Sequence, residues 1–106
     1  MTFEAVRIIP ANHPTLPGHF PGSPLVPGVV ILDEVLAALI EWRQDLQLTG
    51  IRMVKFLAPL QPERAFTILF SAKNEHAEEV TFCCRLEDRV IVEGQLEIAW
   101  ESKMSR

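Results

Sequence analysis

The chain has 106 residues, 48% of them hydrophobic, which is enough for one globular domain. Charged residues make up 23% and leave a net charge of −4, with no cluster of Lys and Arg. A phosphate backbone requires such a cluster, so we expect no nucleic acid partner. The sequence predicts a single domain over residues 1–106.

A secretory signal consists of a positively charged start, an apolar stretch and a cleavage site with small residues. The N-terminal residues do not show this order. We therefore expect a cytoplasmic protein. The longest apolar run, Val29 to Ile40, has twelve residues and is interrupted by Asp33 and Glu34. It falls short of the roughly 20 residues that span a bilayer, so it predicts a buried helix and no membrane span.

The first elements are a strand and a long loop. Residues Thr2 to Ile9 alternate loosely, as a strand does. The stretch Pro10 to Pro27 holds six of the eight prolines, which excludes regular helix or sheet. Apolar residues within it favour an ordered loop, and a long anchored loop in a small domain is often functional. These residues are Leu16, Phe20, Leu25 and Val26.

A helix and four strands are expected to follow. Pro27 suits the first helical position, and the helix is expected to reach about Leu46. Its apolar positions cover nearly the full circumference, so we expect other structure to wrap it on most sides. Four later segments alternate with a period of two, and their short polar links favour antiparallel hairpins. They are Ile51 to Ala58, Ala65 to Ala72, Glu79 to Leu86 and Val90 to Trp100. This order predicts an α+β fold, one helix against one curved sheet.

The sequence gives little sign of a disulfide or a metal site. Cys83 and Cys84 are adjacent in a predicted strand and would point to opposite faces, so we expect two packed thiols. His19 and Asp33 lack the i, i+4 spacing of helical metal ligands, and no other ligand cluster accompanies them.

Asp33 stands out because it lies within the apolar helix. At about 100° per residue, its face is otherwise apolar and consists of Val29, Val30, Leu36, Ala37 and Ile40. Another stripe, expected to face water, contains Glu34, Glu41 and Asp45. A carboxyl group in apolar surroundings favours its protonated form, which makes Asp33 a candidate general acid. The alternative is that Asp33 only accepts hydrogen bonds from loop amides.

His19 is the candidate base. It is flanked by Gly18 and by the rigid run Phe20-Pro21-Gly22. Such a loop holds a side chain in a fixed direction, which a catalytic base requires. A loop histidine without a catalytic part is the alternative. His13 and His76 have no comparable setting, and we expect both to be ordinary surface residues.

The start of the helix is a candidate anion site. The N–H groups of Gly28 and Val29 would lie at the positive end of the helix dipole, with little side-chain obstruction. An oxyanion could bind there. The alternative is that Gly28 only allows close packing.

Together these residues carry a family resemblance. The run from His19 to Asp33 resembles the active-site signature of the β-hydroxyacyl-(acyl carrier protein) dehydratases of fatty acid synthesis. It keeps the His-Phe-Pro-Gly start, the Pro-Gly helix start, and an acid fourteen positions after the histidine. The segment Lys55 to Pro62 is similar to the family's third-strand region. Two residues depart from the pattern: Asp33 stands where the general dehydratases have glutamate and the isomerising branch has aspartate, and Ala37 replaces a common glutamine.

The resemblance implies a hot-dog fold, one long buried helix wrapped by a curved antiparallel sheet. It also implies a dimer in which the histidine of one subunit meets the acid of the other. In this sequence His19 would be the base and Asp33 the acid, and we expect Gly28, Val29 and Phe20 to contact substrate. The family chemistry needs neither a metal nor an organic cofactor.

The implied reaction is a lyase reaction, the dehydration of 3-hydroxyacyl thioesters on acyl carrier protein to trans-2-enoyl thioesters. It would belong to fatty acid or related polyene and lipid synthesis. The alternatives are a hot-dog acyl thioesterase and a non-catalytic acyl-binding accessory subunit. Expected partners are the carrier protein and a second subunit, in a homodimer, a higher homo-oligomer or a heterodimer with a related dehydratase. Because carrier protein is acidic, Arg52, Lys55 and Arg64 are candidate contacts.

Overall fold

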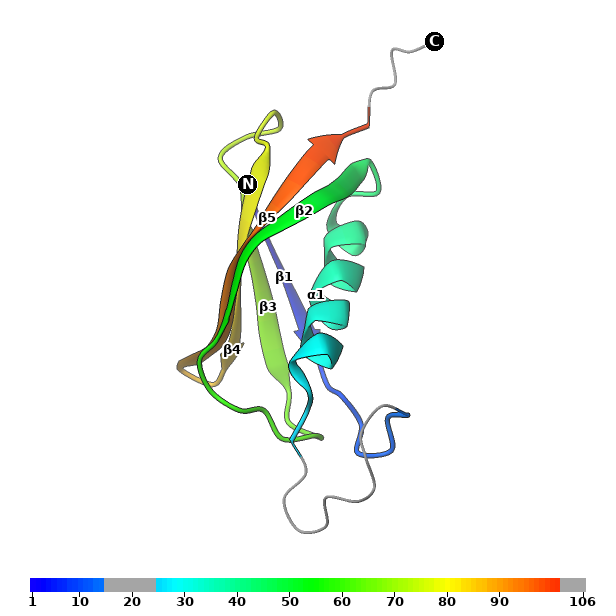
Figure 1. Cartoon of the computed structure of the whole chain (residues 1–106), viewed down its shortest axis with the longest axis vertical. Helices are drawn as coiled ribbons and strands as arrows, with labels where there is room; N and C mark the ends of the chain where they lie inside the picture. The colour runs from blue at the N-terminus through cyan, green and yellow to red at the C-terminus, as the bar shows by residue number, and fades with distance from the viewer. Residues whose placement is uncertain (15–24, 102–106) are drawn as a thin grey trace.

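The computed structural model describes residues 1–14 and 25–101, and over these residues it contains one helix and five strands (Figure 1). The elements are β1 (Thr2–Arg7), α1 (Gly28–Trp42), β2 (Leu46–Phe56), β3 (Phe66–Ser71), β4 (Glu79–Leu86) and β5 (Arg89–Trp100). All strand pairs are antiparallel, in the order β1-β3-β4-β5-β2, and α1 lies against one face of the sheet. The predicted α+β hot-dog architecture is confirmed.

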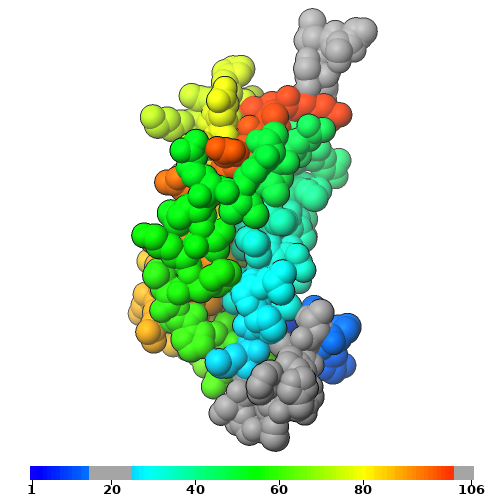
Figure 2. Space-filling model, viewed as in Figure 1, coloured from blue at the N-terminus to red at the C-terminus, as the bar shows by residue number. Residues whose placement is uncertain are grey.

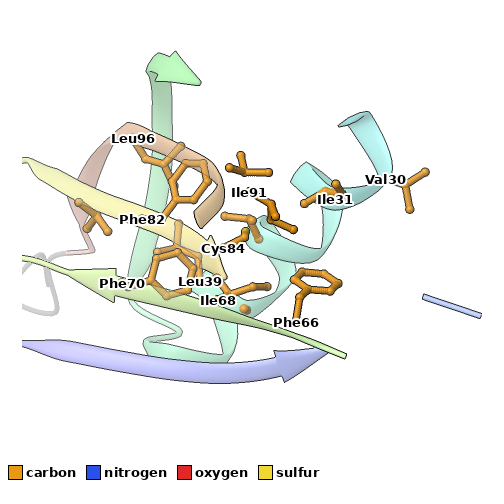
Figure 3. Close-up of a cluster of buried hydrophobic side chains, with 14 of the residues drawn as sticks. Val30, Ile31, Leu39, Phe66, Ile68, Phe70, Phe82, Cys84, Ile91 and Leu96 are labelled. Carbon is orange, nitrogen blue, oxygen red and sulfur yellow. The ribbon is translucent and has the colours of Figure 1, made fainter. Parts of the chain in front are cut away.

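The core forms between α1 and the inner face of the sheet. Successive strand side chains point to opposite faces, so β3 and β4 each bury every second residue. The buried strand residues include Phe66, Ile68, Phe70, Val80, Phe82 and Cys84, and α1 covers them with Val30, Ile31, Val35, Ala38 and Leu39 (Figure 3). Each buried side chain of this size contributes about 1.5–3 kcal/mol, so this shared layer holds the helix on the sheet.

The two cysteines are free, and their predicted placement on opposite faces is confirmed. Cys84 is buried in the core, whereas Cys83 is only partly buried. Burial, with a smaller contribution from Cys83, raises the pKa of the Cys84 thiol to about 12. This thiol therefore stays protonated at neutral pH and is a packing group, not a nucleophile.

The helix is shorter than the sequence predicts. Pro27 is the N-cap residue with extended backbone (φ −61°, ψ 145°), and the last helical residue is Trp42, not Leu46. Arg43 is also extended, and its guanidinium forms a forked pair with Asp45 (3.1 and 2.9 Å) over the ring of Trp100. This turn allows Leu46 to begin β2 opposite Trp100. Within the described residues, no helix is both long and apolar enough to cross a membrane.

The expected hairpin between β2 and β3 is wrong. β3 already has β1 and β4 as its two neighbours, so β2 occupies the opposite edge beside β5. The N–H groups of Leu57 and Ala58 both donate to the carbonyl of Ile91 (2.8 and 3.2 Å). These bonds keep the chain along β5 beyond the end of β2, before it crosses to β3. The other two short links, from β3 to β4 and from β4 to β5, connect paired strands as predicted.

β2 is a long edge strand that begins before Gly50, not after it. Its pairing with β5 shifts register twice, between Leu48 and Gly50 and between Ile51 and Met53. Irregularities of this kind bend a strand and increase its twist. β2 therefore curves along the helix while its outer edge remains unpaired within the described residues.

The packing between β5 and its two neighbouring strands can be tested at Gly94 of β5 and Gly50 of β2. A Cβ on Gly94 would lie 2.5 Å from Cε1 of the buried Phe82 and 2.6 Å from the backbone oxygen of Met53. Neither atom can yield, so we expect Gly94→Ala to lower the free energy of unfolding by about 1–3 kcal/mol in urea titrations at fixed protein concentration. A Cβ on Gly50 would meet only the carboxylate end of Glu97 (2.7 Å). Gly50→Ala should stay within about 0.5 kcal/mol, and equal losses would contradict this packing.

Candidate functional site

The start of α1 and the end of β2 line an open apolar groove. The two elements lie side by side on one face of the molecule, α1 in cyan and β2 in green (Figure 2). The groove has a volume of about 470 Å³. Its lining consists of Leu25, Val26, Gly28, Ile31, Phe56, Leu57, Ala58, Pro59 and Leu60. Every one of these side chains is uncharged, so the groove suits an apolar ligand.

The N-terminus of α1 opens at this groove. The N–H groups of Val30 and Ile31 donate to the carbonyl of Pro27 (3.0 and 3.4 Å). Those of Gly28 and Val29 have no acceptor within the described part of the chain. Among the described residues no side chain caps the helix, and its first turn contains no acidic residue. As far as the described residues go, the positive end of the helix dipole is available to an anionic or polarised oxygen.

Phe56 is a groove residue that the sequence reasoning missed. A Cβ on Gly28 would lie 2.7 Å from Cζ and 2.8 Å from Cε1 of the Phe56 ring. The close packing that one interpretation of Gly28 predicts is thus present, and beside it lie two N–H groups that have no acceptor among the described residues. Phe56 is paired with the buried Val92, yet it is 53% exposed. No sequence signal separates it from a core strand residue, because the contact depends on how β2 meets the helix.

Asp33 is exposed, so the prediction that this chain buries it among apolar side chains is wrong. The helix turns its opposite face to the sheet. Its neighbours on the outward face are exposed too: Val29 is 63% exposed, Ile40 is 59% exposed, and Ala37 is also exposed. The predicted face is only partly correct, because Val30 is buried (2% exposed) and Leu36 is partly buried. The sequence pattern could not tell which of two apolar faces meets the sheet. The described residues of this chain do not provide the predicted wrapping of the helix on most sides.

Asp33 shares the outward side of α1 with exposed apolar residues, which we group with exposed apolar residues of β2 under the name α1–β2 face. It consists of Val29, Ala37 and Ile40 of α1 and Leu48, Ile51 and Phe56 of β2. The three β2 residues belong to the inner side of the sheet, since they pair with Ile98, Leu96 and Val92, which are buried. Large exposed apolar side chains on two neighbouring elements make this face a candidate interaction surface.

Glu34 and Glu41 are structural acids. Nε of Arg7 donates to Oε1 of Glu34 (3.1 Å), and a terminal nitrogen of Arg7 donates to Oε2 of Glu41 (2.6 Å). The hydrogen bond to Glu41, with the charges of both acids, raises the pKa of Arg7. Burial opposes this effect, but the net direction is upward, so Arg7 stays charged and ties β1 to α1. The predicted separation of Glu34 from the face of Asp33 is confirmed. The predicted water-facing stripe is wrong in part, because Glu34 is partly buried and Asp45 lies beyond the end of α1.

The histidines divide into three cases. His19 and Phe20 lie outside the described residues, so their roles as base and substrate contact stay predictions. His13 is partly buried, and its backbone N–H donates to the carbonyl of Pro10 (3.1 Å). His76 is exposed beside a groove of about 550 Å³ near the β3–β4 turn, at the end of the molecule away from the start of α1 (Figure 1). That groove has no helix terminus in its lining.

The three basic residues predicted to contact carrier protein differ in their surroundings. Arg52 bonds to the carboxylates of Glu79 and Glu97, each at 3.0 Å. Arg64 forms a pair with Glu87 at 3.2 Å. Lys55 is exposed next to Phe56 and forms no ion pair with the described residues. Exposed ion pairs are weak, so the pairs of Arg52 and Arg64 contribute little to stability. Of these three basic residues, Lys55 is the one without an acidic partner among the described residues, and it is adjacent in sequence to Phe56 of the groove.

Comparison with known proteins gives a consistent set of similarities. A family model described as ApeI-like, ApeI dehydratase, matches residues 2–95. The chain is 31% identical to the 3-hydroxyacyl-(acyl-carrier-protein) dehydratase FabZ of Chlamydia trachomatis, over 95% of this chain and 74% of that protein. It resembles a chain of the dehydratase heterocomplex ApeI:P from Xenorhabdus doucetiae with a TM-score of 0.72 and 28% identity, over 92% and 87% of the two chains. An uncharacterized protein from Erwinia carotovora shares the fold, with a TM-score of 0.78 and 22% identity over 93% and 83% of the two chains.

Because Asp33 and Glu34 have different surroundings, we expect their substitutions to differ in their effect on thermal stability. We expect Asp33→Asn to leave the thermal midpoint unchanged or raised, because this carboxylate has no partner among the described residues. Glu34→Gln should lower the midpoint by about 1–4 °C, since it weakens a partly buried bond to Arg7. Differential scanning fluorimetry measures both. A larger loss for Asp33→Asn than for Glu34→Gln would contradict the observed orientation of the helix.

Proposed function

Because the chain belongs to the ApeI-like family of dehydratases, we propose that it dehydrates 3-hydroxyacyl thioesters on acyl carrier protein. The products are trans-2-enoyl thioesters for fatty acid or related polyene and lipid synthesis. The structural observation that supports this most is the uncapped start of α1 at an apolar groove. An acyl chain fits such a groove, and the carbonyl oxygen of a thioester fits the N–H groups beside it.

The reaction has two difficult parts: removal of a weakly acidic α-proton and departure of a hydroxyl group. In the proposed mechanism the N–H of Gly28 donates to the thioester oxygen and stabilises the charge that develops there. His19, as a neutral imidazole, accepts the α-proton. The electron pair of that C–H bond forms the new double bond, the C–O bond breaks, and Asp33 donates the proton that turns the leaving hydroxyl into water.

The orientation of Asp33 supports a site shared between two chains. Asp33 is exposed on α1, on the side of the helix that also carries the exposed Val29 and Ile40. A carboxyl group in that position becomes enclosed only when something else covers the face. A second subunit would exclude water there, favour the protonated acid, and bring its own loop histidine to the substrate.

We propose that the second subunit is another copy of this chain. The exposed side chains of Ile40 and Ile51 support this proposal, because a partner that covers them would remove apolar area from water. The unpaired edge of β2 also offers backbone groups to the equivalent edge of a partner. The Xenorhabdus doucetiae relative is part of a heterocomplex, so a heterodimer with a related dehydratase is the alternative assembly.

The activity test uses synthetic 3-hydroxyacyl carrier proteins of several lengths, with mass spectrometry to detect the loss of water. We expect His19→Ala and Asp33→Asn each to lower kcat/KM by at least about 100-fold, because a positioned acid or base contributes about 10²–10⁴-fold. Glu34→Gln should stay within about threefold, since this acid bonds to Arg7 and lies away from the proposed site.

The same spectra distinguish the other functions. A thioesterase would release a free 3-hydroxy acid and leave unloaded carrier, and an accessory subunit would leave the substrate unchanged. Inactivation by Glu34→Gln together with full activity of Asp33→Asn would contradict the assignment of the acid.

A complementation test examines the shared site. Mixing the inactive His19→Ala and Asp33→Asn proteins, with subunit exchange, should restore roughly a quarter of wild-type activity per site, because half of the dimers are mixed and each holds one intact site. Mass-labelled subunits measured by native mass spectrometry report how many mixed dimers form.

Two matched variants serve as controls. Ile51→Glu, on the α1–β2 face, should prevent both dimer formation and recovery when it is present in both proteins. Val6→Glu alters a residue of β1 that is also exposed (63%, against 47% for Ile51) but lies on the other edge strand, so it should change neither. Mixed dimers that form without regaining activity would show that His19 and Asp33 act within one chain.

A further inference from the structure

Arg7 of β1 forms all the side-chain hydrogen bonds that join α1 to the rest of the described chain. Nε of Arg7 donates to Oε1 of Glu34 (3.1 Å), and a terminal nitrogen donates to Oε2 of Glu41 (2.6 Å). No other side chain of α1 forms a hydrogen bond to a described residue outside the helix. Glu34 and Glu41 are about two turns apart, so both lie on the same side of α1. Arg7 therefore holds the helix at two points along one side.

Arg7 is itself held in place by the sheet. Its backbone pairs with Phe66 of β3, which is 1% exposed, and its own side chain is only 20% exposed. The planar guanidinium presents its N–H groups at fixed angles to one another. The two carboxylates that accept from it are therefore tied to the position of the sheet.

The apolar contacts of α1 restrain its rotation about its own axis less strictly. Val35 and Ala38 are 0% exposed and pack on the sheet from one side, whereas Val29 and Ile40 on the other side are largely exposed. Apolar contacts are non-directional, but a hydrogen bond weakens when donor and acceptor lose their alignment. Rotation of the helix would displace both carboxylates from Arg7, so these two bonds resist it.

Rotation of α1 would also displace Asp33. This residue precedes Glu34 in the helix and lies about 100° from it around the axis. Helix side chains lie about 5–6 Å from the axis, so a rotation of about 10° moves a carboxyl group by about 1 Å. A misplacement of about 1 Å in an active site can lower a rate by about 10²-fold.

We propose that Arg7 is a positioning residue that fixes the rotation of α1 and thereby the direction of Asp33. This proposal rests on the proposed dehydratase function, in which Asp33 is the acid. Arg7 acts through the helix and does not touch the substrate. The mild effect expected of Glu34→Gln agrees with this role, because glutamine keeps an oxygen that accepts a hydrogen bond from Arg7.

The test compares Arg7→Met with Phe3→Leu. Arg7→Met keeps a long side chain and removes both hydrogen bonds to α1. Phe3→Leu weakens a different contact between β1 and α1, the stack of Phe3 on Trp42, whose ring centroids are 6.0 Å apart. Both changes should lower the thermal midpoint, so Phe3→Leu controls for a general loss of stability. Arg7→Lys keeps the charge without the planar fork and gives a milder variant for the same measurements.

Steady-state assays with 3-hydroxyacyl carrier protein measure the effect on the reaction. Arg7→Met should lower kcat by about tenfold and leave KM within about twofold, because the displaced acid is needed only in the transition state. Phe3→Leu should stay within about threefold of wild type in both constants. Native mass spectrometry is used to choose a protein concentration at which all variants have the same fraction of dimers.

A double-mutant cycle tests whether Arg7 acts through the two acids. The background variant carries Glu34→Ala and Glu41→Ala, which remove both acceptors. Adding Arg7→Met to this background should lower kcat by less than about twofold, because the bonds that it removes are already absent.

NMR of methyl-labelled protein measures the rotation directly. The methyl groups of Val35 and Ala38 should give NOEs to methyl groups of the sheet, because these side chains are buried against it. NOE intensity falls steeply with distance. Arg7→Met should therefore change the ratio of these intensities, since a rotation brings one side of the helix closer to the sheet and moves the other away. Phe3→Leu should leave the ratio unchanged.

Each contrary result overturns a defined part of the proposal. Wild-type NOE ratios in Arg7→Met would show that Arg7 does not fix the rotation, and changed ratios with wild-type kcat would show that the rotation does not position the acid. An equal loss of kcat in Phe3→Leu would assign the effect to stability, and a further tenfold loss in the double-mutant cycle would exclude the two acids as the route. Wild-type protein without dehydratase activity would overturn the proposed function instead, and the NOE comparison would still decide whether Arg7 fixes the helix.

Discussion

The helix α1 is apolar on two opposite faces, and a sheet on one side can cover only one of them. Val35 and Ala38 are fully buried against the sheet, whereas Val29 and Ile40 remain largely exposed on the other side. Exposed apolar area is unfavourable in water, so this arrangement leaves the monomer with a surface that favours association. Asp33 is exposed on the same side of the helix, where the proposed second subunit would enclose it.

The position of β2 extends this surface. Because β1 takes the free edge of β3, β2 is displaced to the far edge of the sheet, and its inner side projects beyond the area that the helix covers. Phe56 at its end lies on Gly28, and the two line one groove with an open helix terminus. A polar backbone site beside an apolar groove is suited to a thioester, which has one polar carbonyl group on a long apolar chain.

The two adjacent acids of α1 show how neighbouring residues acquire different roles. Glu34 lies about 100° around the helix from Asp33, which brings it to β1 and Arg7. The ion pair between Glu34 and Arg7 helps to hold the helix on the sheet. Arg7 forms a second ion pair with Glu41. Asp33, by contrast, has no hydrogen-bond or ion-pair partner among the described residues and is exposed.

The sequence by itself determined the element types, the α+β class and the family, because strand alternation, the proline-rich loop and the run from His19 to Asp33 are local patterns. It also separated Glu34 from Asp33, since helical periodicity fixes their relative angle. Only the tertiary structure decided which apolar face of α1 meets the sheet, the placement of β2 beside β5, and the contacts that Phe56 and Arg7 make. These features depend on pairings between segments far apart in the chain, and short polar links and an apolar helix are compatible with more than one such pairing.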